Sequence, residues 1–322
     1  MRLNSVLEKM PILILSPHSR CNCRCVMCDI WKITDAIEIS ADDLLRHAGD
    51  MERLGVEWAV FTGGEPLMHS DLFRLCRVLR ERGIRVSVLS TGLLLERHAA
   101  AIVANVDDVI VSLDGPPEVH DRVRRVPGAF GTLRTGVKAI HRLNPDFPVT
   151  ARCTIQHSNC TRLRDTVSAA RESGLHSISF LAADLTSTAF NRPDGWTPER
   201  TAGVALSLED LAGLEREIDA LITAGECGNF VVESPEKLRR IVRHFRGAAV
   251  APLCNAPWVS AVVESDGTVR PCFFHPPIGR IDANNSLFEV INGTRAVAFR
   301  AALEVASDPV CRRCVCSLNY VP

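Results

Sequence analysis

The most informative stretch of the sequence is ILILSPHSRCNCRCVMC, residues 12–28. It begins with Ile12–Leu15, a short apolar run typical of a buried strand, and passes directly into a polar loop with four cysteines. Three of them, Cys21, Cys25 and Cys28, have the spacing C-x3-C-x2-C. Three thiolates in one short loop can bind three irons of a cubane cluster and leave the fourth iron open for a ligand. A zinc knuckle and an incidental grouping of thiols are alternatives that this loop alone leaves open.

The composition of the chain limits its function. The chain has 322 residues, 13 cysteines and a net charge of −1, with 46% hydrophobic, 23% charged and 5% aromatic residues. These values are typical of a globular protein and argue against nucleic acid or an anionic membrane as a partner. No run reaches the roughly 18 apolar residues of a membrane span, and residues 1–17 lack the pattern of a signal peptide. We therefore expect a cytoplasmic protein whose cysteines bind metal rather than form disulfides.

Strand-like and helix-like segments alternate through the first part of the chain. Strands are expected at 12–15, 59–62, 84–89, 109–113, 149–155 and 178–181. Helices are expected at 40–54, 70–82, 93–103, 132–143 and 162–173. This alternation predicts parallel βαβ units. Prolines and glycines interrupt residues 185–203, which predicts a loop, whereas 207–224 and 235–246 are predicted as amphipathic helices.

Small and polar residues follow the strands at the points where they end. Gly63-Gly64-Glu65-Pro66 follows the second strand, Ser90-Thr91-Gly92 ends the third, and Ser112-Leu113-Asp114-Gly115 ends the fourth. In a barrel of parallel strands the carboxyl ends of the strands form the rim where ligands bind. Two adjacent glycines allow a small polar ligand to approach the backbone closely, although a plain turn from strand to helix would also account for them.

Together, the cysteine motif, Gly63–Pro66 and Ser112–Gly115 resemble the radical S-adenosylmethionine (SAM) enzymes, in which such motifs occur in this order. The resemblance covers about residues 11–184 and implies an α/β fold, a partial (β/α)6 parallel-strand barrel. It implies a [4Fe–4S] cluster on Cys21, Cys25 and Cys28, whose open iron chelates SAM. One-electron reduction by a donor such as flavodoxin or ferredoxin then cleaves SAM to a 5′-deoxyadenosyl radical that abstracts hydrogen from the substrate.

The resemblance also implies which residues bind the cofactor. These are Met27, Gly63, Gly64, Glu65, Pro66, Thr91, Ser112 and Asp114. Met27 stands where the family often has an aromatic residue, and Thr91 lacks the asparagine that often follows it. Cys23 is additional to the motif, and its side chain is expected to point away.

The last part of the chain carries a second set of cysteines. They are Cys254, Cys272, Cys311, Cys314 and Cys316. On spacing alone, two separated cysteines and a C-x2-C pair suit zinc and an iron–sulfur cluster equally well, and Asp266-Gly267 predicts a hairpin before Cys272. The tail resembles the SPASM/twitch extension of radical SAM enzymes. This implies one auxiliary [4Fe–4S] cluster on Cys254, Cys272, Cys311 and Cys314, with Cys316 competing for the last place.

We therefore expect three regions: a radical SAM core at 1–206, linking helices at 207–252 and an auxiliary-cluster domain at 253–322. A cluster that accepts an electron from a substrate radical implies an oxidoreductase acting on a small-molecule biosynthetic intermediate. Only 20 residues precede Cys21, which favours this substrate class over the alternative, a maturase that modifies a ribosomally made peptide by crosslink, thioether or epimerisation. No residue is assigned a catalytic role. The candidates for contact with substrate are Asp184, Asn191, Arg192, Asp194, Trp196, Trp258 and His275.

Overall fold

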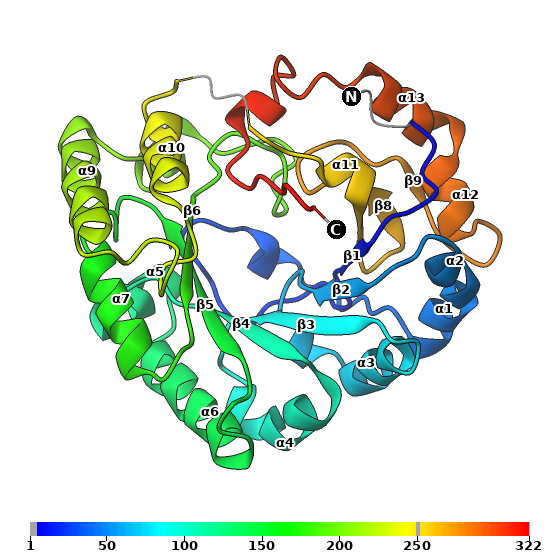
Figure 1. Cartoon of the computed structure of the whole chain (residues 1–322), viewed down its shortest axis with the longest axis horizontal. Helices are drawn as coiled ribbons and strands as arrows, with labels where there is room; N and C mark the ends of the chain where they lie inside the picture. Colours follow the sequence, from blue (N-terminus) through cyan, green and yellow to red (C-terminus); the bar gives the residue numbers. More distant parts are fainter. Residues whose placement is uncertain (1–4, 249–251, 322) are drawn as a thin grey trace.

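The computed structural model describes residues 5–248 and 252–321. Met1 and Pro322, which limit the first and last predicted regions, lie outside the described residues, as do residues 249–251 of the predicted linking region. Within these residues a curved sheet has the strand order β6-β5-β4-β3-β2-β1-β7-β8-β9 (Figure 1). The strands are β1 (Ile12–Leu15), β2 (Trp58–Phe61), β3 (Arg85–Ser90), β4 (Asp108–Ser112), β5 (Val149–Ile155), β6 (Ile178–Ala182), β7 (Ser260–Val263), β8 (Thr268–Arg270) and β9 (Gly279–Arg280). The six strands of the barrel pair in parallel, as the alternation predicted.

Helices cover the outer side of this sheet, with α1 to α4, α6, α7 and α9 along the periphery in Figure 1. The helices are α1 (Ala41–Arg46), α2 (Ala48–Arg53), α3 (Leu72–Arg80), α4 (Leu95–Asn105), α5 (Pro117–Arg124), α6 (Ala129–Leu143), α7 (Leu163–Glu172), α8 (Pro198–Ala202), α9 (Leu208–Thr223), α10 (Pro235–Phe245), α11 (Ala256–Val259), α12 (Leu287–Asn292) and α13 (Thr294–Ala302). The sheet does not close on itself, and the predicted α/β fold with a partial barrel is confirmed.

The two faces of the barrel strands differ in burial. Along β5, alternate residues from Val149 to Ile155 are buried in the hydrophobic core, while Thr150, Arg152 and Thr154 between them are half-buried. Successive side chains of a strand point to opposite faces, so one face packs beneath the helices and the other lines the interior of the barrel. The interior is therefore left accessible to a ligand.

Two helices, α5 and α8, form outside the helices that the sequence predicts. Pro198 lies in the predicted loop 185–203, yet it occupies the first turn of α8, and Pro117 likewise begins α5, for which no element is predicted. Proline fits there because its missing N–H would have no partner within the helix. The prediction of a loop over the whole of 185–203 is therefore wrong at its end.

The predicted helix 40–54 is also divided. Ser40 caps α1 as expected, accepting from the amide of Asp43 at 3.1 Å. At His47 the chain leaves the helical conformation, because its N–H bonds to Leu44 three residues back as well as to Leu45. The chain resumes its helical conformation at Ala48 as α2.

The tail continues the sheet of the barrel. Strand β7 lies parallel to β1, with Ile12 opposite Ser260, and β8 returns antiparallel through the predicted hairpin at Gly267. Gly267 has φ +86° and a Cβ there would lie 2.4 Å from the Ile281 carbonyl oxygen, so glycine is required. The boundary at 253 stays a prediction, since the sheet runs across it.

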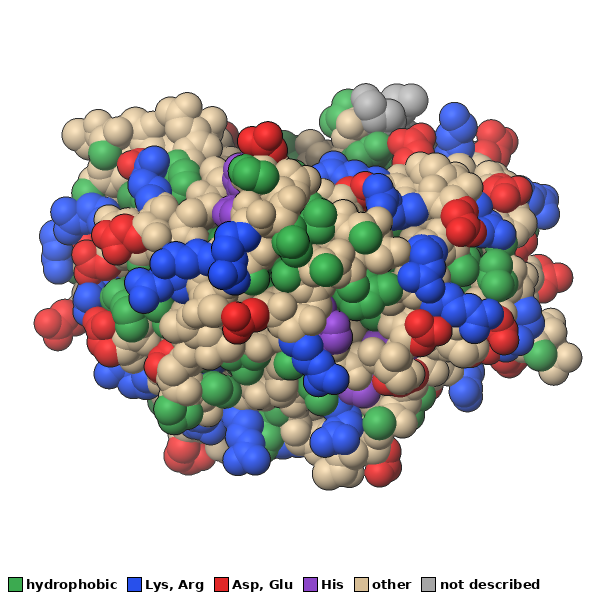
Figure 2. Space-filling model, turned by 90° about the horizontal axis from the view of Figure 1, so that it is seen from below, with side chains coloured by type: hydrophobic (Ala, Val, Ile, Leu, Met, Phe, Trp, Pro, Cys, Tyr) green, Lys and Arg blue, Asp and Glu red, His purple; other side chains and the backbone are tan. Residues whose placement is uncertain are grey.

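The surface matches the nearly neutral composition. Figure 2 shows acidic and basic side chains interspersed over one face, with no region of a single sign. Among the described residues, no helix combines the length and the apolar character needed to cross a bilayer.

Candidate functional site

The loop after β1 brings three cysteines together. Burial raises the pKa of the Cys21 thiol to about 12 and that of Cys28 to about 11, and the nearby sulfur of Cys25 raises both. The three thiols thus act on one another electrostatically within a single loop, and three such thiols are the donor set of a three-cysteine iron–sulfur cluster. Thiols of this kind lose their protons when a metal binds them.

Hydrogen-bond donors surround these sulfurs. The backbone amide of Ile30 donates to Cys28 Sγ at 3.5 Å, and Arg124 Nη1 donates to Cys25 Sγ at 3.4 Å. Donors next to sulfur stabilise thiolate ligands and tune iron–sulfur clusters. The residues present thus fit a [4Fe–4S] cluster.

Cys23 does not point away from the motif, contrary to expectation. It is 1% exposed, and its thiol donates to the sulfur of Cys25, which, together with Arg124, lowers the pKa of Cys25 to about 6. Its backbone amide also bonds to Cys21. Cys23 therefore belongs to the support of the motif.

Arg124 owes its position to a buried ion pair. Its guanidinium lies 2.6 Å from the carboxylate of Asp114, which is fully buried just beyond β4. Asp114 also accepts from the amide of Thr154 at 2.9 Å. Burial alone would lower the pKa of Arg124, but Asp114 and Cys25 raise it above its usual value. Asp114, predicted to bind the cofactor, thus positions the cation beside Cys25.

The Gly63-Gly64 turn packs directly on the cysteine loop. A Cβ on Gly64 would lie 1.9 Å from the Arg20 carbonyl oxygen, and one on Gly63, which has φ +100°, would lie 2.7 Å from Ser16 Cβ. Glycine is therefore required at both positions for this close approach. Both glycines line the central cavity described below.

Glu65 and Thr91 join two strand ends to each other. Glu65 is fully buried and accepts from the amide of Thr91 at 2.6 Å, from Ser90 Oγ at 3.0 Å and from the amide of Leu67 at 3.0 Å. Thr91 Oγ1 donates to Asn22 Oδ1 in the cysteine loop at 2.9 Å. These two predicted cofactor residues hold the rim together, and Pro66 starts the following turn.

Ser112 keeps its hydroxyl available. It is half-buried at the end of β4 and forms no side-chain hydrogen bond with any described residue. Arg152, its partner on β5, also faces the interior and donates to Ser179 Oγ at 3.3 Å. Ser112 and Arg152 could bind a carboxylate from inside the barrel. Met27 is half-buried in the cysteine loop.

The chain end is fastened beside Cys254. The amide of Asn255 donates to the Leu318 carbonyl at 2.8 Å, and the Asn255 side chain pairs with both backbone groups of Tyr320, at 2.6 and 2.9 Å. These bonds place the C-terminal cysteines next to Cys254.

The tail sulfurs converge in the same way. Burial raises the pKa of Cys272 to about 11 and that of Cys311 to about 12, and the Cys254 sulfur adds to both. Burial also raises the pKa of Cys314, and the neighbouring sulfurs of Cys316, Cys254 and Cys272 raise it further. Four thiols that affect one another's pKa in this way form the donor set that a four-cysteine iron–sulfur cluster takes. Cys316 is exposed, and its competition with Cys314 stays a prediction.

A cavity of about 680 Å³ lies between the barrel rim and the tail. This is a size typical of small-molecule sites. Its walls include Gly63, Gly64, Asn191, Arg192, Phe273 and Phe274.

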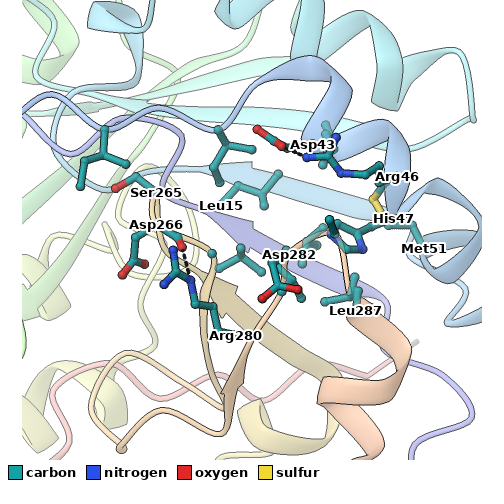
Figure 3. A pocket seen from close by; sticks show the side chains of 18 residues that line it. Leu15, Asp43, Arg46, His47, Met51, Ser265, Asp266, Arg280, Asp282 and Leu287 are labelled. Carbon is teal, nitrogen blue, oxygen red and sulfur yellow. Dashed lines mark hydrogen bonds and ion pairs between the residues drawn. The ribbon is translucent and has the colours of Figure 1, made fainter. Parts of the chain in front are cut away.

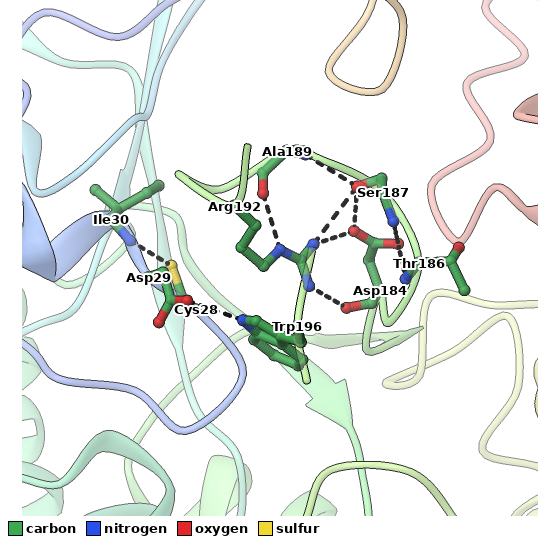
Figure 4. A network of polar contacts seen from close by, with 9 residues as sticks. All are labelled: Cys28, Asp29, Ile30, Asp184, Thr186, Ser187, Ala189, Arg192 and Trp196. Atoms are coloured by element: carbon green, nitrogen blue, oxygen red, sulfur yellow. Dashed lines mark hydrogen bonds and ion pairs between the residues drawn. The ribbon is translucent and has the colours of Figure 1, made fainter. Parts of the chain in front are cut away.

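Asp184 and Arg192 bind each other (Figure 4). Arg192 is 2% exposed, pairs with the Asp184 carboxylate and donates to the carbonyls of Asp184 and Ala189 at 2.8 and 2.9 Å. Asp184 also accepts from the amides of Thr186 and Ser187. Arg192 therefore shapes one wall of the cavity with its charge already compensated.

The same loop docks on Asp29, a residue that sequence reasoning missed. Asp29 directly follows Cys28, is 4% exposed, accepts from Trp196 Nε1 at 2.9 Å and pairs with Arg200. Asn191 Nδ2 donates to the Asp29 carbonyl at 3.1 Å. No local pattern marks this docking contact, because Trp196, Arg200 and Asn191 are more than 160 positions away from Asp29.

The remaining predicted substrate residues do not line this cavity. Asp194 is exposed, and Trp258 packs against the core beside β7. His275 is 4% exposed and lies against Cys311.

A second cavity, of about 360 Å³, opens on the other side of β1, between α1–α2 and the tail (Figure 3). Its floor comprises Leu13, Leu15 and Val263, and Arg46 and Arg280 lie at its edge. It contains none of the residues predicted for the site.

Comparison with known proteins agrees with this arrangement. The profile of the radical SAM superfamily matches residues 15–159, and that of the SPASM iron–sulfur cluster-binding domain matches residues 254–315. The AdoMet-dependent heme synthase of Methanosarcina barkeri is 30% identical over 159 residues, 48% of this chain and 45% of that protein. The antilisterial bacteriocin subtilosin biosynthesis protein AlbA of Bacillus subtilis is 23% identical over 279 residues, 84% of this chain and 57% of that protein.

The fold is also that of a solved relative. Streptococcus suis SuiB bound to S-adenosylmethionine superposes with a TM-score of 0.70 at 15% identity, over 97% of this chain and 73% of SuiB. The chain spans 34 to 45% of the length of the first three curated relatives that it matches. The chain thus belongs to the radical SAM superfamily and carries an SPASM-type iron–sulfur cluster-binding domain in its C-terminal part.

Proposed function

We propose that this chain is an enzyme that carries out a SAM-dependent radical oxidation of a substrate bound in the central cavity. The observation that carries the proposal is the place of this cavity between the two cysteine sets. Gly63 and Gly64, which pack on the first set, form one wall, and Phe273-Phe274, which directly follow Cys272 of the second, form another. A substrate here would lie between both metal sites.

Radical SAM and SPASM domains imply SAM, a SAM-binding [4Fe–4S] cluster and an auxiliary cluster. We propose Cys21, Cys25 and Cys28 as ligands of the first, and Cys254, Cys272, Cys311 and Cys314 as ligands of the second. When bound, SAM and its cluster supply one-electron cleavage of a sulfonium and abstraction of hydrogen from the substrate. A donor such as flavodoxin or ferredoxin would provide the electron.

The chain's own residues bind the substrate and exclude water. Ile30, Ile33 and Phe190 provide apolar walls. Phe190 also meets Phe274 of the tail edge to face, with ring centroids 6.1 Å apart, which joins the docked loop to the tail. Apolar walls that exclude water from a bound substrate protect a reactive intermediate from side reactions.

A small, largely uncharged intermediate fits these walls best. The two guanidiniums that line the cavity are compensated, Arg192 by Asp184 and Arg270 by Glu264 at 2.7 Å. An anionic substrate would have to break one of these pairs, whereas an uncharged one would not. The heme synthases among the relatives support a small-molecule substrate.

Modification of a ribosomally made peptide is the second candidate. The bacteriocin biosynthesis protein AlbA aligns over 84% of this chain, through barrel and tail together, whereas the heme synthase of Methanosarcina barkeri aligns over 48%. A peptide product would favour this candidate over oxidation of a small molecule.

The first experiment measures iron, sulfide and zinc in protein purified without oxygen. About eight irons and eight sulfides per chain are expected for two cubane clusters. Zinc without iron after anaerobic reconstitution would contradict the radical mechanism. With reductant and SAM, Cys28→Ala should form no 5′-deoxyadenosine, and unchanged formation would contradict the assignment of Cys28 as a cluster ligand. Cys272→Ala should still cleave SAM but should lose the substrate-derived product.

A further inference from the structure

We infer that His275 is a positioning residue of the auxiliary site, where its imidazole donates a hydrogen bond to the sulfur of Cys311 and raises the reduction potential of the cluster. The inference rests on the proposed ligand set of the tail. It concerns a side chain that sequence analysis had offered as a substrate contact.

The distances direct the imidazole to sulfur. His275 Nε2 lies 3.4 Å from Cys311 Sγ and 3.7 Å from Asp308 Oδ1. A distance of 3.7 Å is too long for a hydrogen bond from nitrogen to oxygen, whereas the larger sulfur atom accepts at 3.4 Å. Asp308 Oδ1 already accepts from the amides of Val310 and Cys311, at 2.9 and 2.8 Å. In the tautomer that carries its proton on Nε2, which a deprotonated Cys311 ligand requires of this contact, the imidazole donates to Cys311 Sγ.

The orientation of the ring is held by packing. His275 is 4% exposed, and the ring of Phe299 lies against it with centroids 4.9 Å apart. Its backbone carbonyl accepts from Arg270 Nη1 at 3.2 Å. A buried ring that packs against Phe299, on a backbone held by Arg270, keeps its donor in place at little cost in side-chain freedom on cluster binding.

Two other tail sulfurs, those of Cys272 and Cys314, receive donors from the backbone. The amides of Phe274 and His275 oppose the effect of burial on the pKa of Cys272, and the amide of Cys316 does so at Cys314. At Cys311 the corresponding donor is a side chain. Hydrogen bonds to cluster sulfurs set the reduction potential, because they withdraw negative charge from the ligand and favour the reduced cluster. This donor can be removed by mutation, unlike those of the backbone.

The test uses the full chain with Cys21, Cys25 and Cys28 replaced by alanine, so that the auxiliary cluster alone remains. In this background His275→Phe, which removes the donor, and His275→Gln, which offers an amide N–H, are compared in a redox titration followed by electron paramagnetic resonance. His47→Gln is the matched control, since His47 is also buried and contacts no cysteine.

We expect His275→Phe to keep the iron of its parent and to move the midpoint potential to a more negative value. His275→Gln should lie between the two, and His47→Gln should match the parent. A midpoint potential unchanged in His275→Phe at unchanged iron content would overturn the inference. Loss of iron in both His275 variants would also overturn it, since His275 would then be a ligand. A parent without iron would instead contradict the proposed function at the auxiliary site, and the inference with it.

Discussion

Replacement of Asp114 by asparagine should destabilise the barrel far more than an ordinary loss of charge. Asp114 is fully buried and Arg124 is 7% exposed, and their charged groups lie 2.6 Å apart. Asparagine keeps the shape and the acceptor for the amide of Thr154, but it leaves the guanidinium buried without a counter-charge. Breaking a buried pair in this way costs about 3–5 kcal/mol.

The assay is urea denaturation of protein purified without oxygen, at matched iron content. Asp114→Asn is compared with Asp165→Asn, which breaks the exposed pair of Asp165 with Arg162 and should cost at most about 1 kcal/mol. The double variant Asp114→Leu/Arg124→Met should recover much of the loss, because neither charge is then left alone. If Asp114→Asn and Asp165→Asn lowered the free energy of unfolding equally, the buried pair would not support the cysteine loop.

Three further results are expected. Gly64→Ala should displace the cysteine loop, because the new Cβ would lie 1.9 Å from the Arg20 carbonyl oxygen, and bound iron should fall from about eight to about four per chain. Gly49→Ala, whose Cβ would meet open space, should keep all of its iron. Equal iron content in the two variants would refute this packing argument. Asp29→Asn should weaken the docking of Trp196 and Arg200, so limited proteolysis within 186–203 should be faster than in the parent. Lys32→Gln removes an exposed partner of the same carboxylate, and this variant should be cleaved at the parental rate. Burial would raise the pKa of Asp210, but hydrogen bonds from Ser207 and His157 hold it below its ordinary value of 3.8. The ionised carboxylate therefore stabilises the folded state above pH 3.8. This stabilisation is lost as the pH falls through the lower pKa of the folded state. The stability difference between the parent and Asp210→Asn should therefore persist at neutral pH and shrink below about pH 4; a difference independent of pH would contradict this.

Local patterns in the sequence were sufficient for much of the fold. The alternation of apolar and amphipathic segments located all six barrel strands, a serine cap located the start of α1, and amphipathic periodicity located α9. Proline misled the prediction at α8, because its effect depends on whether it begins a helix or interrupts one.

Motif spacing likewise brought out the two cysteine sets and the Gly63-Gly64 turn, because each depends on neighbours along the chain. The resemblance to radical SAM enzymes implied cofactor binding for Glu65 and Asp114, which stays a prediction; the structure shows in addition that both carboxylates join elements of the rim. A motif shows which residues meet at a site, but the partners of each side chain depend on packing.

The sequence by itself therefore determined the class of the protein, the order of its strands along the chain and the cysteines that fit its metal sites. The tertiary structure alone placed Arg124 beside Cys25, Asp29 beneath Trp196, β7 against β1 and His275 against Cys311. Each of these contacts joins segments far apart in the chain. Such contacts arise from the way the strands and loops close on one another, and no periodicity or spacing within a single segment records that closure.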